Sequence, residues 1–135
     1  MRLYGSASRK GLKTMFKLIV AGGRDFDDYS LLCSTLEKLL SNKDKTQIEI
    51  VEGGARGADR LGCKYAMDRG LVHKRIGADW DTHGKKAGIM RNIEMAEYAD
   101  ALVAFWDQSS KGTLHMIETM KKLGKPVRIV KYEKS

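Results

Sequence analysis

Hydrophobic positions along the chain form two alternating patterns. Short apolar runs predict β-strands at about residues 16–21, 47–51, 101–106 and 127–130, and a weaker signal predicts a fifth strand at 72–77. Segments with apolar residues every three or four positions predict four helices. Asp27 or Asp28 caps the first, whose apolar face runs from Leu31 to Leu40. The other three lie at about residues 58–69, 85–98 and 112–123. Strands alternating with helices at this spacing predict a mainly parallel five-stranded α/β sheet flanked by helices.

Glycine-rich or polar segments follow the first four predicted strands. They begin with Gly22-Gly23-Arg24-Asp25, Glu52-Gly53-Gly54, the polar loop Asp79–Gly84 and the loop Asp107–Lys111. The carboxyl ends of parallel strands lie at one rim of a sheet, and ligands of such folds bind at that rim. The sequence therefore predicts that these four segments share one binding site.

The segment from Glu52 to Asp59 carries the clearest chemistry. Its three glycines, Gly53, Gly54 and Gly57, allow the backbone to approach a ligand closely, and Arg56 offers a planar set of donors to phosphate or carboxylate. A helix is expected to start directly after it, and a helix N-terminus favours an anion. We interpret this segment as a phosphate cradle, in which Asp59 caps or orients the loop.

Length and composition indicate one globular domain. Residues 15–135 are expected to form it, and residues 1–14, which are rich in Ser, Gly and Lys, are expected to be a flexible basic arm. No apolar run approaches the roughly 20 residues that span a bilayer, and no signal peptide is recognisable, so we expect a cytoplasmic protein with no membrane partner. Cys33 and Cys63 are interpreted as small hydrophobic residues rather than a disulfide or a metal pair.

Positive charge is concentrated at the two ends of the chain. The net charge is +8, yet residues 1–17 hold five basic residues and no acid, and residues 121–135 hold six basic residues and one acid. The segment between them has a net charge of about −2. Solvated ends explain this distribution better than a nucleic-acid-binding surface, which stays a weaker alternative.

Four sets of residues resemble a known family. They are Gly22–Phe26, Gly53–Asp59, the group Ala78–Trp80, His83–Gly88 and Met90–Asn92, and finally Lys111–Thr113 with Met116. In this order they resemble the YspA-like, YpsA-related branch of the SLOG superfamily over about residues 16–131. That superfamily also includes the LOG phosphoribohydrolases and the Rossmann domain of DprA.

This resemblance implies a single Rossmann-like domain that binds a nucleotide or a nucleotide-derived phosphorylated ligand, in a sensing, sequestering or processing role. It also implies a homo-oligomer, a dimer or larger. The site residues that it indicates, together with the rim segments, are Gly22, Gly23, Arg24, Asp25, Gly53, Gly54, Arg56, Gly57, Asp79, Trp80, Arg91, Asn92, Lys111, Gly112 and Thr113. Trp80 is equally a core aromatic or a platform on which a base stacks.

Cleavage of a nucleotide N-glycosidic bond is the first alternative, with Arg91, Asp25 and Glu118 as catalytic candidates. LOG enzymes carry Met-x-x-Arg-Lys and Gly-Gly-x-Gly-Thr-x-Glu-Glu, and here Arg91 matches the arginine. His115 and Met116 stand where that family has its two glutamates, and Glu118 lies one turn further on. DprA-like nucleic-acid binding through the basic ends is the second alternative.

Several other chemistries are excluded by missing motifs. The chain lacks the Gly-x-x-x-x-Gly-Lys-Ser/Thr loop of P-loop nucleotide hydrolases and the usual dinucleotide-binding glycine pattern. His73, His83 and His115 show no ligand spacing with the cysteines. We therefore expect no metal site and no cofactor.

Overall fold

Five parallel strands form one sheet at the centre of the protein. In the computed structural model, which describes residues 14–133, the strand order is β3-β2-β1-β4-β5, and every neighbouring pair is parallel. The strands are β1 (Phe16–Gly22), β2 (Ile48–Glu52), β3 (Val72–Arg75), β4 (Ala101–Trp106) and β5 (Val127–Lys131). The predicted five-stranded parallel sheet is confirmed.

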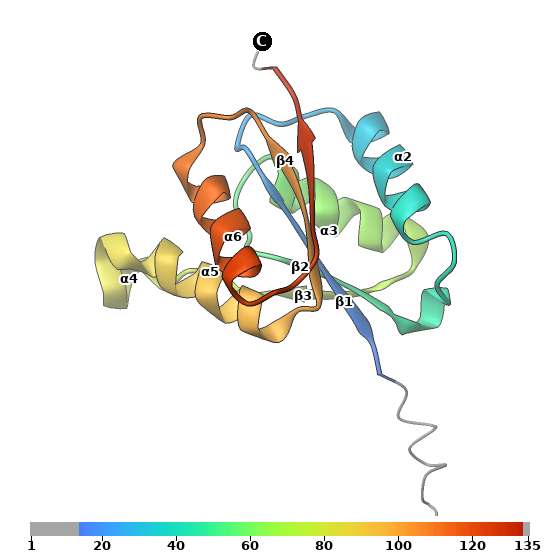
Figure 1. Cartoon of the computed structure of the whole chain (residues 1–135), viewed down its shortest axis with the longest axis horizontal. Coiled ribbons are helices and arrows are strands. Elements are labelled where there is room, and N and C mark those ends of the chain that lie inside the picture. The colour runs from blue at the N-terminus through green and yellow to red at the C-terminus, as the bar shows by residue number, and fades with distance from the viewer. Residues whose placement is uncertain (1–13, 134–135) are drawn as a thin grey trace, which may run out of the picture.

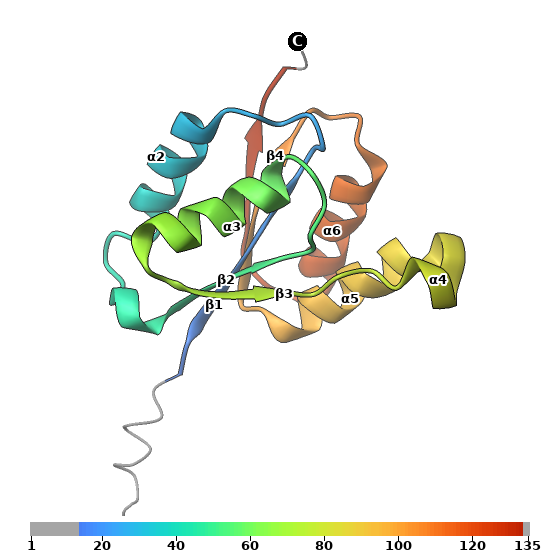
Figure 2. The same ribbon diagram turned by 180° about the vertical axis from the view of Figure 1, so that it is seen from behind.

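Helices cover both faces of the sheet (Figures 1 and 2). Helices α2 (Tyr29–Leu39) and α3 (Ala58–Arg69) lie on one face, and α5 (Ala87–Tyr98) and α6 (Lys111–Lys122) lie on the other. The short helix α4 (Trp80–His83) projects from the body beyond α5 in both views. The protein is thus a three-layer α/β/α sandwich.

Alternating residues of the strands build two separate cores. Leu18 and Val20 of β1 face α2 and α3, whereas Ile19 and Ala21 face α5 and α6. Because β1 and β4 are covered on both faces, β4 and the part of β1 from Leu18 onward are continuous apolar runs, as expected for central parallel strands.

Local signals set most helix boundaries. Asp28 caps α2 by accepting a hydrogen bond from the Leu31 N–H (3.0 Å), and Gly70 ends α3 in the left-handed conformation (φ 68°). The prediction of a polar loop over Asp79–Gly84 is wrong. Asp79 accepts from the Thr82 N–H (3.1 Å) and starts α4, which continues into the 3-10 turn η2 (Gly84–Lys86) before α5. One helical turn is too short for a recognisable apolar period.

Strand order reverses between β1 and β4, and this point positions the site. The chain runs from β1 through α2 to β2 on one side, and β4 pairs with the opposite edge of β1. The loops after β1 and β4 therefore diverge and leave a crevice at their carboxyl ends. The predicted arm over residues 1–14 lies almost entirely outside the described residues, and no helix in the described part of the chain is long and apolar enough to cross a membrane.

Candidate functional site

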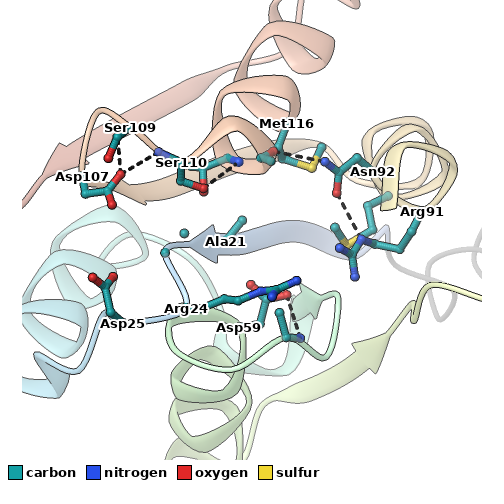
Figure 3. A pocket seen from close by; sticks show the side chains of 16 residues that line it. Ala21, Arg24, Asp25, Asp59, Arg91, Asn92, Asp107, Ser109, Ser110 and Met116 are labelled. Atoms are coloured by element: carbon teal, nitrogen blue, oxygen red, sulfur yellow. Dashed lines mark hydrogen bonds between the residues drawn. The ribbon is translucent and has the colours of Figure 1, made fainter. Parts of the chain in front are cut away.

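A cavity of about 480 Å³ occupies the crevice between β1 and β4 (Figure 3). Residues from β1, from the loops after β1, β2 and β4, and from α3, α5 and α6 line it. They are Ala21, Gly22, Gly23, Arg24, Asp25, Ala55, Asp59, Arg91, Asn92, Met95, Asp107, Ser109, Ser110, Gly112, Thr113 and Met116. Four separate segments of the chain thus contribute to one hollow.

The turn after β1 contributes to the cavity and leaves no room for a side chain at its two glycines, Gly22 and Gly23. A Cβ on Gly23 would overlap the Tyr132 hydroxyl, which itself donates a hydrogen bond to Asp25 Oδ1 (2.5 Å). The Gly23 carbonyl accepts the Ala58 N–H (3.2 Å), which fastens this turn to the start of α3. Gly57 lies directly against it with φ 77°, and a Cβ there would overlap the Gly23 carbonyl oxygen.

A buried carboxylate holds the glycine loop after β2. Asp59 Oδ2 accepts the N–H groups of Gly53 (2.9 Å) and Ala55 (3.3 Å). Burial raises the pKa of the Asp59 carboxyl to about 6, while the backbone donors and Arg91 act in the opposite direction. The Asp59 side chain, although it lines the cavity, therefore orients the loop after β2, which is one of the two roles expected for it.

Arg91 and Asn92 connect the loop after β2 with the first turn of α6. Arg91 Nη1 donates to the Gly53 carbonyl (2.7 Å), and Arg91 Nε donates to Asn92 Oδ1 (3.1 Å). Asn92 Nδ2 in turn donates to the Gly112 carbonyl and lies 3.2 Å from both that oxygen and His115 Nδ1. This chain of contacts spans the cavity on the α5 side and fixes both rims relative to each other.

The N-terminus of α6 forms the opposite wall. Ser110 Oγ caps the helix by accepting the Thr113 N–H (3.3 Å). Asp107 Oδ1 accepts the N–H groups of Ser109 and Ser110, both at 2.8 Å, and so shapes the loop before the helix. Gly112 and Thr113 line the cavity in the first turn of a 12-residue helix, where partial positive charge favours an anion.

A smaller hollow of about 210 Å³ adjoins the cavity and is rich in arginine. It shares Arg24, Ala55 and Arg91 with the main cavity, and its lining adds Gly53, Gly54, Arg56, Arg60, Ala78 and Trp80. Four guanidinium groups therefore lie around one small space. The Trp80 side chain is 53% exposed at its margin, so the core alternative for this residue is wrong.

Comparison with known proteins places the chain in a family. The model of the YspA, cpYpsA-related SLOG family matches residues 16–83. The chain belongs to this SLOG family. It is also 34% identical over 119 residues to the Gene 61 protein of Mycobacterium phage D29, an alignment that covers 84% of this chain and 94% of the phage protein.

Solved structures of DNA processing protein A share the fold of this SLOG chain. The protein from Streptococcus pneumoniae superposes with a TM-score of 0.65 at 18% identity, over 87% of this chain and 50% of that one. The protein from Helicobacter pylori, studied for its single-stranded DNA binding mode, has a TM-score of 0.65 at 20% identity, over 89% of this chain and 67% of that one. The chain thus spans half the length of the first of these proteins.

The structure separates the predicted site residues of this SLOG domain into three groups. Gly22, Gly23, Arg24, Asp25, Arg91, Asn92, Gly112 and Thr113 line the main cavity, and Gly53, Gly54, Arg56 and Trp80 line the smaller hollow. Gly57, Asp79, Lys111 and Glu118 line neither space. Gly57 serves the packing of two loops, Asp79 caps α4, and Lys111 and Glu118 are exposed on α6.

Some lining residues escaped the sequence analysis. Met95 and Met116 lie on the inner faces of α5 and α6, where the apolar pattern indicates core rather than site. Ser109 and Ser110 stand where LOG enzymes have glycines; they belong to the loop Asp107–Lys111, which the sequence placed at the rim without singling out either serine.

Proposed function

We propose that the chain binds a nucleotide or a nucleotide-derived phosphorylated ligand in the cavity at the carboxyl ends of β1 and β4. The observation that carries this proposal is the juxtaposition of the polar cavity with the hollow where Arg24, Arg56, Arg60 and Arg91 gather. Phosphate at the arginines leaves the larger space for sugar and base. Its volume falls in the usual range for small-molecule sites.

Groups around the main cavity suit the uncharged part of such a ligand. Asp25, Asp107 and Asn92 offer hydrogen-bonding atoms to sugar hydroxyls or a base edge, and Met95 and Met116 provide apolar surface. Three carboxyl groups beside two arginines make this cavity a poor site for phosphate, except at the first turn of α6. The expected orientation therefore has the charge toward the smaller hollow.

Calorimetry of the full chain with nucleoside monophosphates, diphosphates and cyclic nucleotides tests this proposal. Arg24→Ala removes a guanidinium shared by both spaces and should weaken binding about 10-fold or more. Arg128→Ala is the matched control, because Arg128 is exposed on β5 and lines neither space. Absence of binding by every member of the panel, with a folded sample, contradicts the proposal.

N-glycosidic cleavage of a nucleotide is a second candidate, because Arg91 and Asp25 line the same cavity. Glu118 does not line the cavity, so Asp25 is the one that remains of the two carboxylates named from the sequence as catalytic candidates. Release of free base from a nucleoside monophosphate, lost in Arg91→Ala and Asp25→Asn, is the expected result for an enzyme. Binding without base release assigns a sensing or sequestering role.

Single-stranded DNA is a third candidate ligand, favoured by the arginine hollow and by the binding mode studied in the Helicobacter pylori protein. A polynucleotide contacts several cations, so its affinity falls steeply with salt and rises with strand length. Removal of residues 1–14 should then reduce binding of an oligonucleotide at low salt. Equal binding with and without these residues argues against the use of the basic arm.

Self-association is a further part of the proposal. Trp80, Ile89, Met90 and Ile93 are exposed large hydrophobic side chains on α4 and α5, with 40–53% of each accessible. Light scattering coupled to size-exclusion chromatography measures the mass directly. We expect a dimer or larger, and a monomer at high concentration would contradict it.

A further inference from the structure

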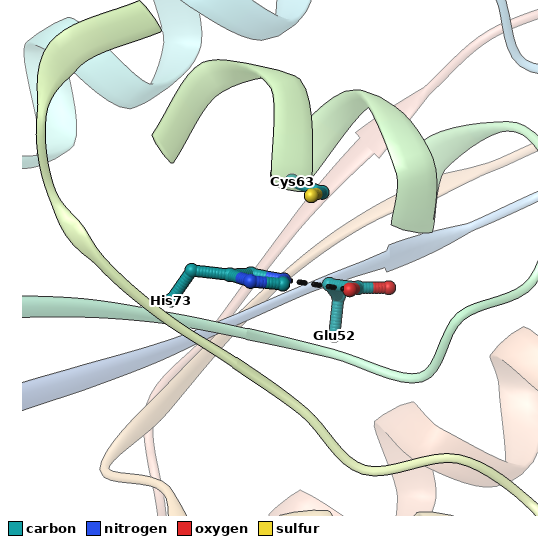
Figure 4. A group of neighbouring side chains, drawn as sticks. All are labelled: Glu52, Cys63 and His73. Carbon is teal, nitrogen blue, oxygen red and sulfur yellow. Dashed lines mark hydrogen bonds and ion pairs between the residues drawn. The ribbon is translucent and has the colours of Figure 1, made fainter. Parts of the chain in front are cut away.

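Three side chains on the α3 side of the sheet lie together apart from the cavity: Glu52, Cys63 and His73 (Figure 4). Glu52 ends β2, Cys63 lies in the middle of α3, and His73 lies in β3, so one β-α-β unit supplies all three. One oxygen, one sulfur and one nitrogen atom of these residues all lie within 4.8 Å of one another. We propose that they bind a divalent metal ion of the zinc class.

The donor set selects this class of metal. Thiolate, imidazole and carboxylate are the three ligand types that proteins use for Zn²⁺, whereas Ca²⁺ and Mg²⁺ take oxygen ligands. Ligand atoms of a tetrahedral zinc ion lie about 3.4–3.8 Å apart. Glu52 Oε2 and His73 Nε2, now 2.7 Å apart, would open by about 1 Å to reach that spacing. The Cys63 sulfur lies within 4.8 Å of both partners, and Figure 4 shows Cys63 pointing from α3 toward the Glu52–His73 pair.

Glu52 is built to be one of the ligands. Its side chain is fully buried, and Oε1 is held by the Gly54 N–H at 2.6 Å. Oε2 accepts His73 Nε2 (2.7 Å) and Arg75 Nε (2.6 Å). A metal bound to Oε2 and to Nε2 would require the neutral His73 tautomer that carries its proton on Nδ1, and the thiol proton of Cys63 would pass to solvent.

The charges of the cluster allow a metal ion to take the place of Arg75 beside Glu52. A divalent cation with a carboxylate, a thiolate and a neutral imidazole has no net charge, so Glu52 no longer needs Arg75 as its counter-ion. The Arg75 side chain is 47% exposed on the edge strand β3, and it can turn into water. Three protein ligands leave a fourth position for water, as in open zinc sites.

The expectation of no metal site rested on residue spacing. Motifs based on residue spacing detect metal ligands that are close together in the sequence. Here β2, α3 and β3 each contribute one ligand, so no such motif is present. The parallel register of β2 and β3 aligns Ile50 with His73 and Glu52 with Arg75, and it is this tertiary alignment that brings imidazole and carboxylate together.

Cobalt titration of the chelator-treated full chain tests the site. Co²⁺ bound by a thiolate gives a near-ultraviolet charge-transfer band, and we expect one equivalent per chain, displaced by Zn²⁺. Cys63→Ser and His73→Ala should lose the band or shift its affinity strongly. Cys33→Ser and His83→Ala are the matched controls, since Cys33 is the other free, partly buried cysteine and His83 is exposed on α4.

The Co²⁺ affinity of Arg75→Gln is an independent test, because a cluster that only stabilises the fold would not bind Co²⁺ more tightly in this variant. Removal of the competing cation should tighten Co²⁺ binding about two- to fivefold, the usual worth of a partly exposed ion pair. No thiolate band in excess Co²⁺, a band that persists in Cys63→Ser, or unchanged or weaker binding in Arg75→Gln would overturn the proposal. Thermal unfolding of each variant checks that the fold is retained.

Discussion

Arg91 donates a hydrogen bond of 2.7 Å to the carbonyl oxygen of Gly53, from a helix on one face of the sheet to the loop after β2. The same guanidinium reaches Asn92 Oδ1 through Nε (3.1 Å) and lines both the main cavity and the arginine hollow. Two of its N–H groups are thus used to fix its own position. The remaining donors are held in place for an anionic ligand, with little conformational entropy left to lose.

Substitution of Arg91 should therefore affect ligand binding more than its single charge suggests. We expect Arg91→Ala to weaken nucleotide binding about 10- to 100-fold, since a charge-assisted hydrogen bond and the loop anchor are lost together. Arg91→Lys keeps the charge but not the planar guanidinium, so its affinity for the nucleotide should lie between those of the wild type and Arg91→Ala. Calorimetry measures the affinities, and an Arg91→Ala protein that binds as tightly as the wild type contradicts this role.

Asp59 should make stability depend on pH in an unusual direction. The pKa of Asp59 in the folded state is about 6, above the ordinary 3.8. Between pH 3.8 and 6 the folded protein therefore binds more protons at this group than the unfolded chain does. The free energy of unfolding then falls as pH rises from about 4 to 6 and is level above that. The size of this contribution is about 3 kcal/mol, at about 1.4 kcal/mol per pH unit.

Asp59→Asn isolates that contribution, because the amide does not titrate and its oxygen can still accept from Gly53 and Ala55. Urea unfolding at several pH values should show the variant gaining stability relative to the wild type between pH 4 and 7. A difference that stays constant over this range would show that Asp59 has no raised pKa.

Gly57 is expected to be intolerant of any side chain. Gly57→Ala combines a positive φ of 77° with overlap of the Gly23 carbonyl oxygen, and we expect a loss of about 3 kcal/mol or more. Gly70→Ala is the comparison, since Gly70 has φ 68° and open space around it, and should cost about 1 kcal/mol. If Gly57→Ala and Gly70→Ala lose equal free energy of unfolding in urea, the turn after β1 moves away from Gly57 at little cost and the overlap adds nothing.

Lys125 should stabilise the helix that carries Arg91. Its Nζ donates to the carbonyls of Ala96 (2.8 Å), Glu97 (3.2 Å) and Ala99 (2.8 Å), at the C-terminus of α5. Lys125→Met keeps the aliphatic stem and removes these donors, so we expect a loss of about 1–3 kcal/mol in urea unfolding. Lys131→Met, at an exposed position on β5, serves as control and should leave stability within about 0.5 kcal/mol.

Sequence patterns predicted the fold well because most strands are short, largely apolar runs closed by a glycine or polar segment, although the edge strand β3 (Val72–Arg75) is mostly polar. Strand β4 and the part of β1 from Leu18 onward are continuous apolar runs, and their central place follows from burial on both faces. Helix α4 escaped because its four residues are all exposed or nearly so, with no apolar period. Its only local sign was Asp79, a residue that caps a helix and begins a turn equally well.

The two hollows bring together the predicted arginines and most of the predicted glycines, whereas the sequence did not indicate groups whose role depends on contacts between loops. Arg24 was indicated because it follows a strand end, and Arg91 and Asn92 were indicated by the family resemblance; all three line the cavity. Gly57 carries the same sequence signal as Gly53 and Gly54, and only the approach of the Gly23 turn shows that it packs rather than binds. Likewise, the closeness of Cys63 to Glu52 and His73 is fixed by how α3 packs on the sheet.

The rim is fastened mainly through peptide groups. Asp59 holds two backbone N–H groups, Arg91 and Asn92 hold the carbonyls of Gly53 and Gly112, and Ala58 donates to the Gly23 carbonyl. Substitutions at Ala55 or Ser109, which line the cavity without anchoring it by their side chains, therefore change its chemistry at little cost to its shape. Such an arrangement lets ligand preference diverge during evolution while the scaffold persists.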